Sequence, residues 1–305
     1  MKARTYLRLL FACSLVVPAA CDVKDSIFET PHPEHGTLTL TTDWSARGEG
    51  VPVPASYTVE ATPAGTASAA YTATLSETTC LLDHLFAPGK HSIRVYNTPQ
   101  HITVSGTTAT VAAATTPPAG QTGSTLFVHN DPEWLFTSAG EALVEKDKAA
   151  QPHTAVMRQQ VRRLTLIIEP RGETAARIAG ITGALSGVAG TLEMGDGTHG
   201  TPSAVALAFS PITEGTDAGR WQATVRLLGT AGAEQRLRAT ILFEDGTPQA
   251  LTLDSDLSAA LATFNADKRT PCVLGGSVVE TPTGTDIGAT ITDWTPAGGG
   301  PVTAD

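Results

Sequence analysis

Alternation of apolar and polar side chains is the feature of this sequence that most restricts its fold. Leu38 and Leu40 alternate with threonines, and the same period of two recurs at 57–62, 92–96 and 101–104. Such alternation is typical of antiparallel strands with one buried face. Turn sequences such as Pro88-Gly89 and Ser105-Gly106 separate these segments and would end each strand. The pattern predicts an all-β chain.

A second series of strands follows the first. Its members are expected at 161–170, 181–192, 204–209, 221–228, 237–243, 250–253, 271–279 and 287–294. Because short, evenly spaced strands occur in two series, we predict two tandem β-sandwiches with Greek-key type connections. The predicted divisions are a signal peptide (1–20), a tether (21–35), an N-terminal sandwich (36–158), a C-terminal sandwich (159–296) and a tail (297–305).

One or two short helices are expected in the second sandwich. Residues 173–178 predict a short turn of helix. In residues 256–265, Leu257, Leu261 and Phe264 recur at helical spacing, which would place them on one apolar face. Ser255 precedes this run and is a residue type that commonly caps a helix N-terminus.

Composition excludes several classes of protein. The 305 residues carry 20 basic and 30 acidic side chains, a net charge of −10. Nucleic-acid binding requires a basic stripe, and none is present. The apolar content of 41% with only 16% charged residues disfavours intrinsic disorder. Beyond the first 20 residues, no apolar run approaches the roughly 20 residues that span a bilayer.

The first 21 residues have the organisation of an export signal with a lipidated cysteine. Basic residues at positions 2, 4 and 8 precede an apolar stretch at 9–17, followed by Pro18-Ala19-Ala20-Cys21. This stretch is too short to span a membrane, so it predicts a cleaved signal. Small residues before Cys21 resemble a bacterial lipobox, with Pro18 where leucine is common. We therefore expect a lipid on Cys21, whereas cleavage at Cys13 would divide the apolar stretch.

Removal of the three basic residues in 1–20 would leave 17 basic and 30 acidic residues, a net charge of −13. An anionic membrane surface would not attract such a body. We therefore expect the lipid on Cys21 to supply the attachment.

Sequence motifs that would indicate chemistry are absent or better explained as structure. Gly195–Gly200 fits a dinucleotide-binding spacing, but a strand pattern rather than a helix follows, so a hairpin turn is predicted. The segment 254–265 begins like a calcium loop but has Ala259 and Asn265 at its sixth and twelfth positions, where glycine and glutamate are required. The eight histidines show no metal-binding spacing. We predict no catalytic residue, cofactor or metal site.

Two cysteines remain outside the leader. Cys80 and Cys272 fall in different predicted sandwiches. A disulfide between them would suit an oxidising compartment, but strands of separate sandwiches seldom lie within the roughly 6 Å that a disulfide needs. Two free thiols are the favoured interpretation.

Several segments are informative through their order and spacing along the chain. After the candidate lipid-bearing cysteine come a strand ending in Asp43-Trp44, then segments 86–97, 157–168 and 185–190, and finally Ile291-Thr292-Asp293-Trp294. Together these segments resemble the FimB/Mfa2 family of fimbrial anchor subunits. The resemblance implies two transthyretin-like sandwiches on the outer membrane, anchored through the lipid on Cys21. It also implies a non-enzymatic anchor that limits fibre length and contacts fimbrial shaft subunits by strand addition.

Two further residues belong to alternative interpretations. A surface glycan-binding lipoprotein would need an exposed aromatic platform, and Trp134, beside Pro132, is the tryptophan that falls in a predicted loop. Arg47 lies in the turn sequence Ser45–Gly50, where a trypsin-like protease could cut, although a solvated loop arginine is the favoured interpretation.

Overall fold

A computed structural model describes residues 34–114, 126–171, 175–244, 246, 250–283 and 286–297. The strands are β1 (Gly36–Asp43), β2 (Tyr57–Pro63), β3 (Tyr71–Leu75), β4 (Thr79–Leu81), β5 (Gly89–Tyr96), β6 (Ile102–Ser105), β7 (Thr108–Val111), β8 (Phe127–Val128), β9 (Phe136–Val144), β10 (Lys148–Val156), β11 (Arg158–Gln159), β12 (Arg162–Glu169), β13 (Ile178–Glu193), β14 (His199–Pro211), β15 (Trp221–Leu227), β16 (Arg236–Phe243), β17 (Leu251–Asp256), β18 (Cys272–Ser277), β19 (Val279–Thr283), β20 (Asp286–Thr290) and β21 (Thr295–Pro296). A single 3-10 turn, η1 (Ala175–Arg177), precedes β13. The predicted all-β class is confirmed, with strands in several sheets.

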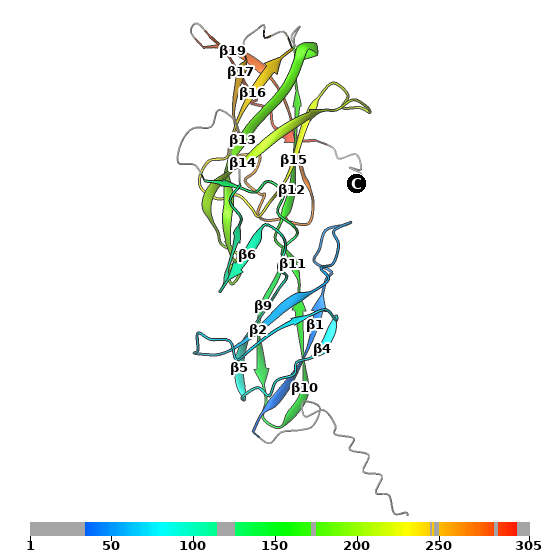
Figure 1. The fold of residues 1–305 in the computed structure, drawn as a ribbon, viewed down its shortest axis with the longest axis vertical. Helices are drawn as coiled ribbons and strands as arrows, with labels where there is room; N and C mark the ends of the chain where they lie inside the picture. Colours follow the sequence, from blue (N-terminus) through cyan, green and yellow to red (C-terminus); the bar gives the residue numbers. More distant parts are fainter. Residues whose placement is uncertain are drawn as a thin grey trace, which may run out of the picture.

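Two sheets form the lower body in Figure 1. One has the strand order β10-β1-β4 and the other β11-β9-β5-β2-β3. The alternation read from the sequence holds here, because Leu38 and Leu40 of β1 are 2% and 1% exposed. These leucines pack in one cluster with Val59 of β2 and Val95 of β5. Burial of alternate side chains from the two sheets therefore forms this first core.

Strand β1 is the central strand of its sheet. It pairs antiparallel with β4 and parallel with β10, where Leu40 faces His153. The parallel pairing joins residues more than 100 positions apart. The first described strand is consequently held on both sides by segments that come later in the chain.

A larger sheet forms the upper body in Figure 1, with the strand path β19-β20-β17-β16-β13-β14-β15-β12-β18-β21. Strand β13 runs for 16 residues, and its pairing with β14 shifts register between Ser186 and Val188. Gly187 lies at this bulge with φ of +71°, a conformation that L-residues with a side chain rarely adopt. A bulge of this kind bends and twists a long strand.

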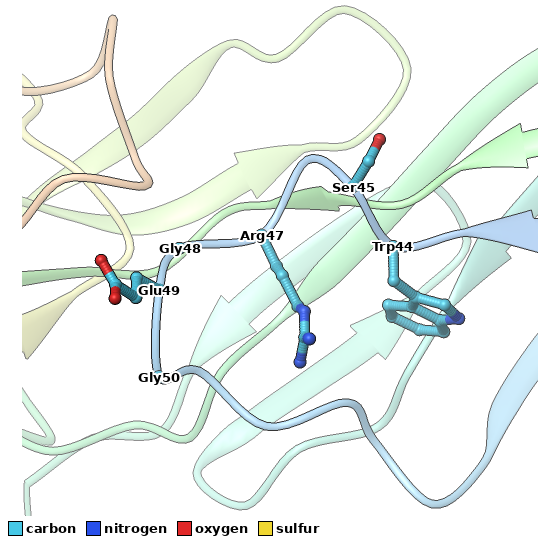
Figure 2. Close-up of a pocket in the computed structure, with 6 residues that line it drawn as sticks. All are labelled: Trp44, Ser45, Arg47, Gly48, Glu49 and Gly50. Atoms are coloured by element: carbon cyan, nitrogen blue, oxygen red, sulfur yellow. The ribbon is translucent and has the colours of Figure 1, made fainter.

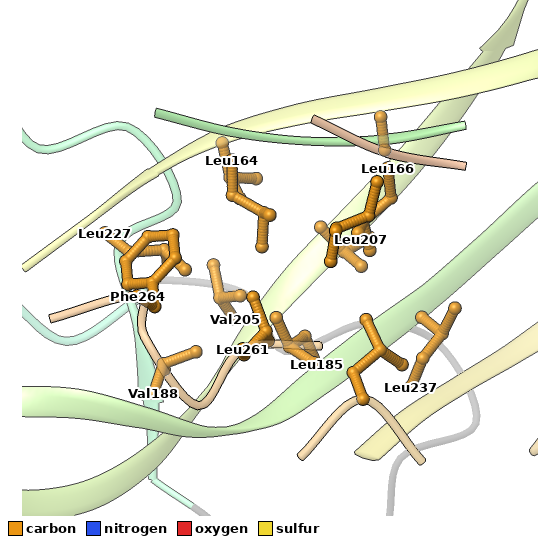
Figure 3. Close-up of a cluster of buried hydrophobic side chains, with 14 of the residues drawn as sticks. Leu164, Leu166, Leu185, Val188, Val205, Leu207, Leu227, Leu237, Leu261 and Phe264 are labelled. Carbon is orange, nitrogen blue, oxygen red and sulfur yellow. The ribbon is translucent and has the colours of Figure 1, made fainter. Parts of the chain in front are cut away.

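The core of the upper body is a large cluster of buried aliphatic side chains (Figure 3). Leu164 and Leu166 from β12 are fully buried, as is Leu185 from β13. Leu261 and Phe264, from the segment between β17 and β18, join the same cluster. A segment without regular structure therefore contributes to the packing of the sheets.

The helix expected at 256–265 is not found, and the described residues contain no α-helix. Residues 258–266 form consecutive turns, and most of their hydrogen bonds span three residues, as from Phe264 N to Leu261 O at 2.9 Å. Ser255 is not a cap: it lies in β17 and accepts a hydrogen bond from Trp294 Nε1 at 2.8 Å. The apolar spacing correctly predicted which side chains are buried but not the backbone conformation. The expected short turn at 173–178 is described only from residue 175, as η1.

The chain crosses between the two bodies before residue 158. Strand β7 pairs with β13, β8 pairs with β14, and β6 forms a hairpin with β7. Strands β9 and β10 then return to the lower sheets.

The transthyretin-like character of the sandwiches and the limits 36–158 and 159–296 stay predictions. The predicted tail, 297–305, lies outside the described residues except for Ala297.

Candidate functional site

The predicted lipid site, Cys21, and all but the last two residues of the tether 21–35 lie outside the described residues. The described chain enters the lower body at its lower end (Figure 1), where Gly36 exchanges two backbone hydrogen bonds with Phe86 at 3.0 and 2.9 Å. The described residues include no helix long and apolar enough to cross a membrane. Attachment through Cys21 therefore stays a prediction.

The segment joining the two bodies carries a buried glutamine. The Gln159 side chain, 4% exposed, accepts a hydrogen bond from Gly48 N at Oε1, 2.8 Å away. Its Nε2 donates to Lys268 O at 2.7 Å and to Val161 O at 2.9 Å. One amide thus ties the loop after β1 to the segment before β18. Gly48 permits this approach, because a Cβ there would lie 2.5 Å from Arg269 O.

Replacement of Gln159 by alanine should loosen this junction. The change would leave Gly48 N–H and the Lys268 carbonyl without their partner, and an unsatisfied buried group costs about 1–3 kcal/mol. We expect a fall of that size in the free energy of unfolding, measured by urea denaturation, and faster proteolysis of the loop at 45–52. The matched control is Gln160→Ala, because the Gln160 side chain is half-buried and bonds mainly to Thr137 Oγ1 at 2.7 Å. Equal losses in the two variants would contradict the junction role.

A buried lysine lies beside this glutamine. Lys268 Nζ donates to Leu228 O at 2.7 Å and lies 3.2 Å from His199 Nε2. Burial, with a smaller effect of nearby Arg162, lowers the pKa of Lys268 to about 7. Burial and the Lys268 charge lower the pKa of His199 to about 4. Neutral His199 can accept a hydrogen bond from the lysine, which lets the amine remain in the protein interior.

A pocket of about 450 Å³, which we call the junction pocket, opens where the two bodies meet. Its lining residues are Glu49, Gly50, Val51, Pro52, Trp134, Gln159, Arg163, Arg226, Lys268, Arg269 and Pro271. They come from the loop after β1, the segment before β9, strand β11, the ends of β12 and β15, and the loop before β18. Basic side chains predominate in this pocket although the chain as a whole is acidic.

Trp134 lies in the irregular segment before β9, as the sequence predicted, but it is not an exposed platform. The indole is half-buried and packs against both hydrophobic clusters. The Arg226 guanidinium carbon lies 5.3 Å from its ring centroid, and Arg226 also pairs with Asp131 at 2.6 Å. Trp134 is therefore a pocket-lining residue.

The turn that contains Arg47 forms a second, shallow hollow (Figure 2), lined by Trp44, Ser45, Arg47, Gly48, Glu49 and Gly50. Arg47 is exposed and donates from Nη1 to Val51 O at 2.8 Å, across the loop. The turn follows β1 directly, and Gly48 is held by Gln159. Arg47 thus has a structural partner in its own loop, as a loop arginine would. Cleavage after Arg47 by a trypsin-like protease stays an alternative interpretation.

The glycine-rich sequence, the acidic segment at Asp254 and the two cysteines all lie in ordinary strands and turns. Residues 194–196 form the turn between β13 and β14, so the Gly195–Gly200 sequence belongs to a hairpin, as predicted. Asp254 pairs with Arg236 at 2.8 Å and with Arg238 at 3.3 Å. Among the described residues, no group of three or more histidine, cysteine or acidic side chains could hold a metal. Cys80 in β4 and Cys272 in β18 belong to different sheets and are free thiols.

The fold is shared with solved surface proteins of Bacteroidales. A candidate adhesin from Bacteroides ovatus superposes with a TM-score of 0.58 at 16% identity, over 83% of this chain and 92% of that one. The fimbrial anchor protein Mfa2 from Porphyromonas gingivalis gives 0.53 at 15% identity, over 86% and 96%. A candidate polysaccharide-binding protein from Bacteroides thetaiotaomicron gives 0.55 at 8% identity, over 87% and 99%.

In sequence, no protein family and no curated protein matches this chain. At such low identities the superpositions show a common fold and nothing about activity. The structural neighbours nevertheless include the Mfa2 anchor protein, together with adhesins, so the resemblance to the FimB/Mfa2 family is confirmed at the level of the fold.

Proposed function

We propose that this chain is a fimbrial anchor subunit of the FimB/Mfa2 type, a non-enzymatic lipoprotein of the outer membrane surface. The observation that carries the proposal is the superposition on Mfa2, which includes 86% of this chain and 96% of the anchor protein. A match over both bodies is more informative than a match of one sandwich, because sandwiches serve many unrelated functions.

The position of the first strand supports attachment through the N-terminus. Strand β1 begins at the lower end of the molecule (Figure 1) and is paired on both sides. A force applied to a lipid on Cys21 would be transmitted to the folded body through β1. Its ladders with β4 and β10 would share the load.

Contact with shaft subunits is proposed to occur by strand addition. Among the described strands, β3 has β2 as its sole neighbour in the sheet order and so ends the five-stranded sheet. An unpaired strand edge offers backbone donors and acceptors to an extended segment of another chain. Strand addition would add a ladder to a sheet without changing the core.

The anchor role predicts that shaft subunits copurify with this chain. A tagged copy expressed in its own host should recover a fimbrial shaft protein from solubilised outer membranes, whereas another tagged surface lipoprotein should not. Deletion of the gene should release fibres into the medium and increase their length, measured by electron microscopy. Unchanged attachment and length after deletion, or recovery of no shaft protein, would overturn the anchor role.

A further inference from the structure

The junction pocket is a partly open hollow with more basic than acidic side chains in its lining. Four basic residues line it, Arg163, Arg226, Lys268 and Arg269, against the single acidic residue Glu49. The whole chain has the opposite balance, with 30 acidic and 20 basic residues. Walls of protein around such a cluster concentrate its field on a bound anion.

Two of these arginines are direct neighbours across a pair of strands. Arg163 of β12 faces Arg226 of β15 in antiparallel register. Like charges opposite one another in a sheet are unfavourable. Arg226 is compensated by its ion pair with Asp131, but Arg163 has no ion pair or hydrogen bond from its guanidinium in the part of the chain that the structure describes. A ligand anion would supply the missing charge.

Arg269 and Trp134 provide further recognition groups. The Arg269 side chain is exposed, and its guanidinium likewise has no partner among the described residues. Trp134 lies half-buried in the pocket wall, and its indole N–H makes no hydrogen bond among the described residues, whereas those of Trp44 and Trp294 each do. The Glu49 carboxylate at the same pocket can accept hydrogen bonds from hydroxyl groups. Lys268 directs its amine to Leu228 O and His199 and is not needed for binding.

We propose that the junction pocket binds an acidic sugar unit of a polysaccharide, with its carboxylate between Arg163 and Arg269 and its ring beside Trp134. Guanidinium groups suit carboxylates because two parallel hydrogen bonds form at once. The volume of about 450 Å³ lies within the range of small-ligand sites. This binding goes beyond the anchor role and does not depend on it.

A peptide strand is a poorer occupant of this pocket. Strand β12 is paired on both sides, with β15 and β18, and β15 is paired with β14 and β12. From Leu164 onward β12 has a partner on each side, and beside the pocket the outward-facing N–H of Arg226 in β15 already donates to Asn130 O at 3.0 Å, so an extended peptide would find few backbone groups to pair with there. A compact hollow of about 450 Å³ with unpaired guanidinium groups suits an acidic sugar better than an extended peptide.

The test is calorimetric titration of the full chain in detergent with three probes. These are trigalacturonic acid, the neutral α-1,4-galactotriose and a sulfated heparin disaccharide. We expect the galacturonate to bind, more weakly as salt increases, and the neutral trisaccharide to give no heat at the same concentrations. Equal affinity for the neutral sugar, binding of the sulfated probe alone, or binding of none would overturn the proposal.

Variants locate the site. Arg163→Gln should weaken galacturonate binding about ten-fold to a hundred-fold, as expected for loss of a charged hydrogen-bonding group, and Arg269→Gln should weaken it similarly. The matched control is Arg158→Gln, because Arg158 is an exposed arginine on β11 outside the lining. Without ligand, Arg163→Gln should not lower the thermal midpoint, since it removes a repulsion. Unchanged affinity in both pocket variants would overturn the assignment.

Discussion

Replacement of Cys21 by serine should move the protein from the membrane fraction to the soluble fraction of the cell envelope. A hydroxyl cannot accept the thioether-linked diacylglyceryl group of a lipoprotein. Each buried CH₂ contributes about 0.8 kcal/mol, so two or three acyl chains hold a protein almost permanently, while a single short chain is marginal. Without the lipid, a body with a net charge of −13 after loss of residues 1–20 has no attraction to an anionic surface.

The matched control is Cys13→Ser, which changes the other cysteine of the same leader. We expect this variant to remain with the membrane. Mass spectrometry of the native protein should find an N-terminus at Cys21 that carries fatty acids. If Cys21→Ser stays as firmly attached as the parent, the lipid-anchor proposal is wrong, and a lipid at Cys13 would be revealed by loss of attachment in the control.

The change Gly187→Ala should be among the most destabilising single substitutions in the upper body. At φ of +71°, alanine carries a backbone penalty of about 1–2 kcal/mol, and its Cβ would lie 2.1 Å from Glu234 O. Relief of such a clash requires the strands to move, at a further cost of about 1–3 kcal/mol. We expect a total loss of about 2–5 kcal/mol in the free energy of unfolding.

The control for this prediction is Gly197→Ala. Gly197 has a similar φ of +78°, but nothing lies within 4 Å of a Cβ placed there. The control should therefore show the backbone penalty alone. Chemical denaturation of the two variants separates the contributions, and equal losses would show that the approach to Glu234 has no energetic importance.

Many of the strands and turns were predictable from the sequence because their causes are local, although β9 and β10 were not predicted. The alternation at Leu38 and Leu40 appears as alternate burial in β1. The glycine-rich sequence at 195–200 forms a hairpin turn because glycine accepts positive φ, as at Gly197. Each of these features depends on residues within a few positions of one another.

The segment 256–265 shows where local reasoning failed. Helical spacing placed Leu257, Leu261 and Phe264 together, and all three are buried in one core. The backbone of residues 258–266 nevertheless forms consecutive turns rather than an α-helix. Packing on the sheets decides this conformation: the cations of Arg162 and Lys268 lie 5.0 and 5.6 Å from the Phe264 ring centroid, and Arg162 Nη1 donates to Phe264 O at 2.9 Å.

The sequence alone determined the all-β class, the positions of many strands and the candidate lipid site, because each follows from short-range pattern. Only the tertiary structure decided the parallel pairing of β1 with β10, the crossing of β6–β8 to the larger sheet and the junction pocket. Glu49, Trp134, Arg163 and Arg269 are widely separated along the chain. No spacing rule connects them, since their proximity results from the packing of two bodies around Gln159.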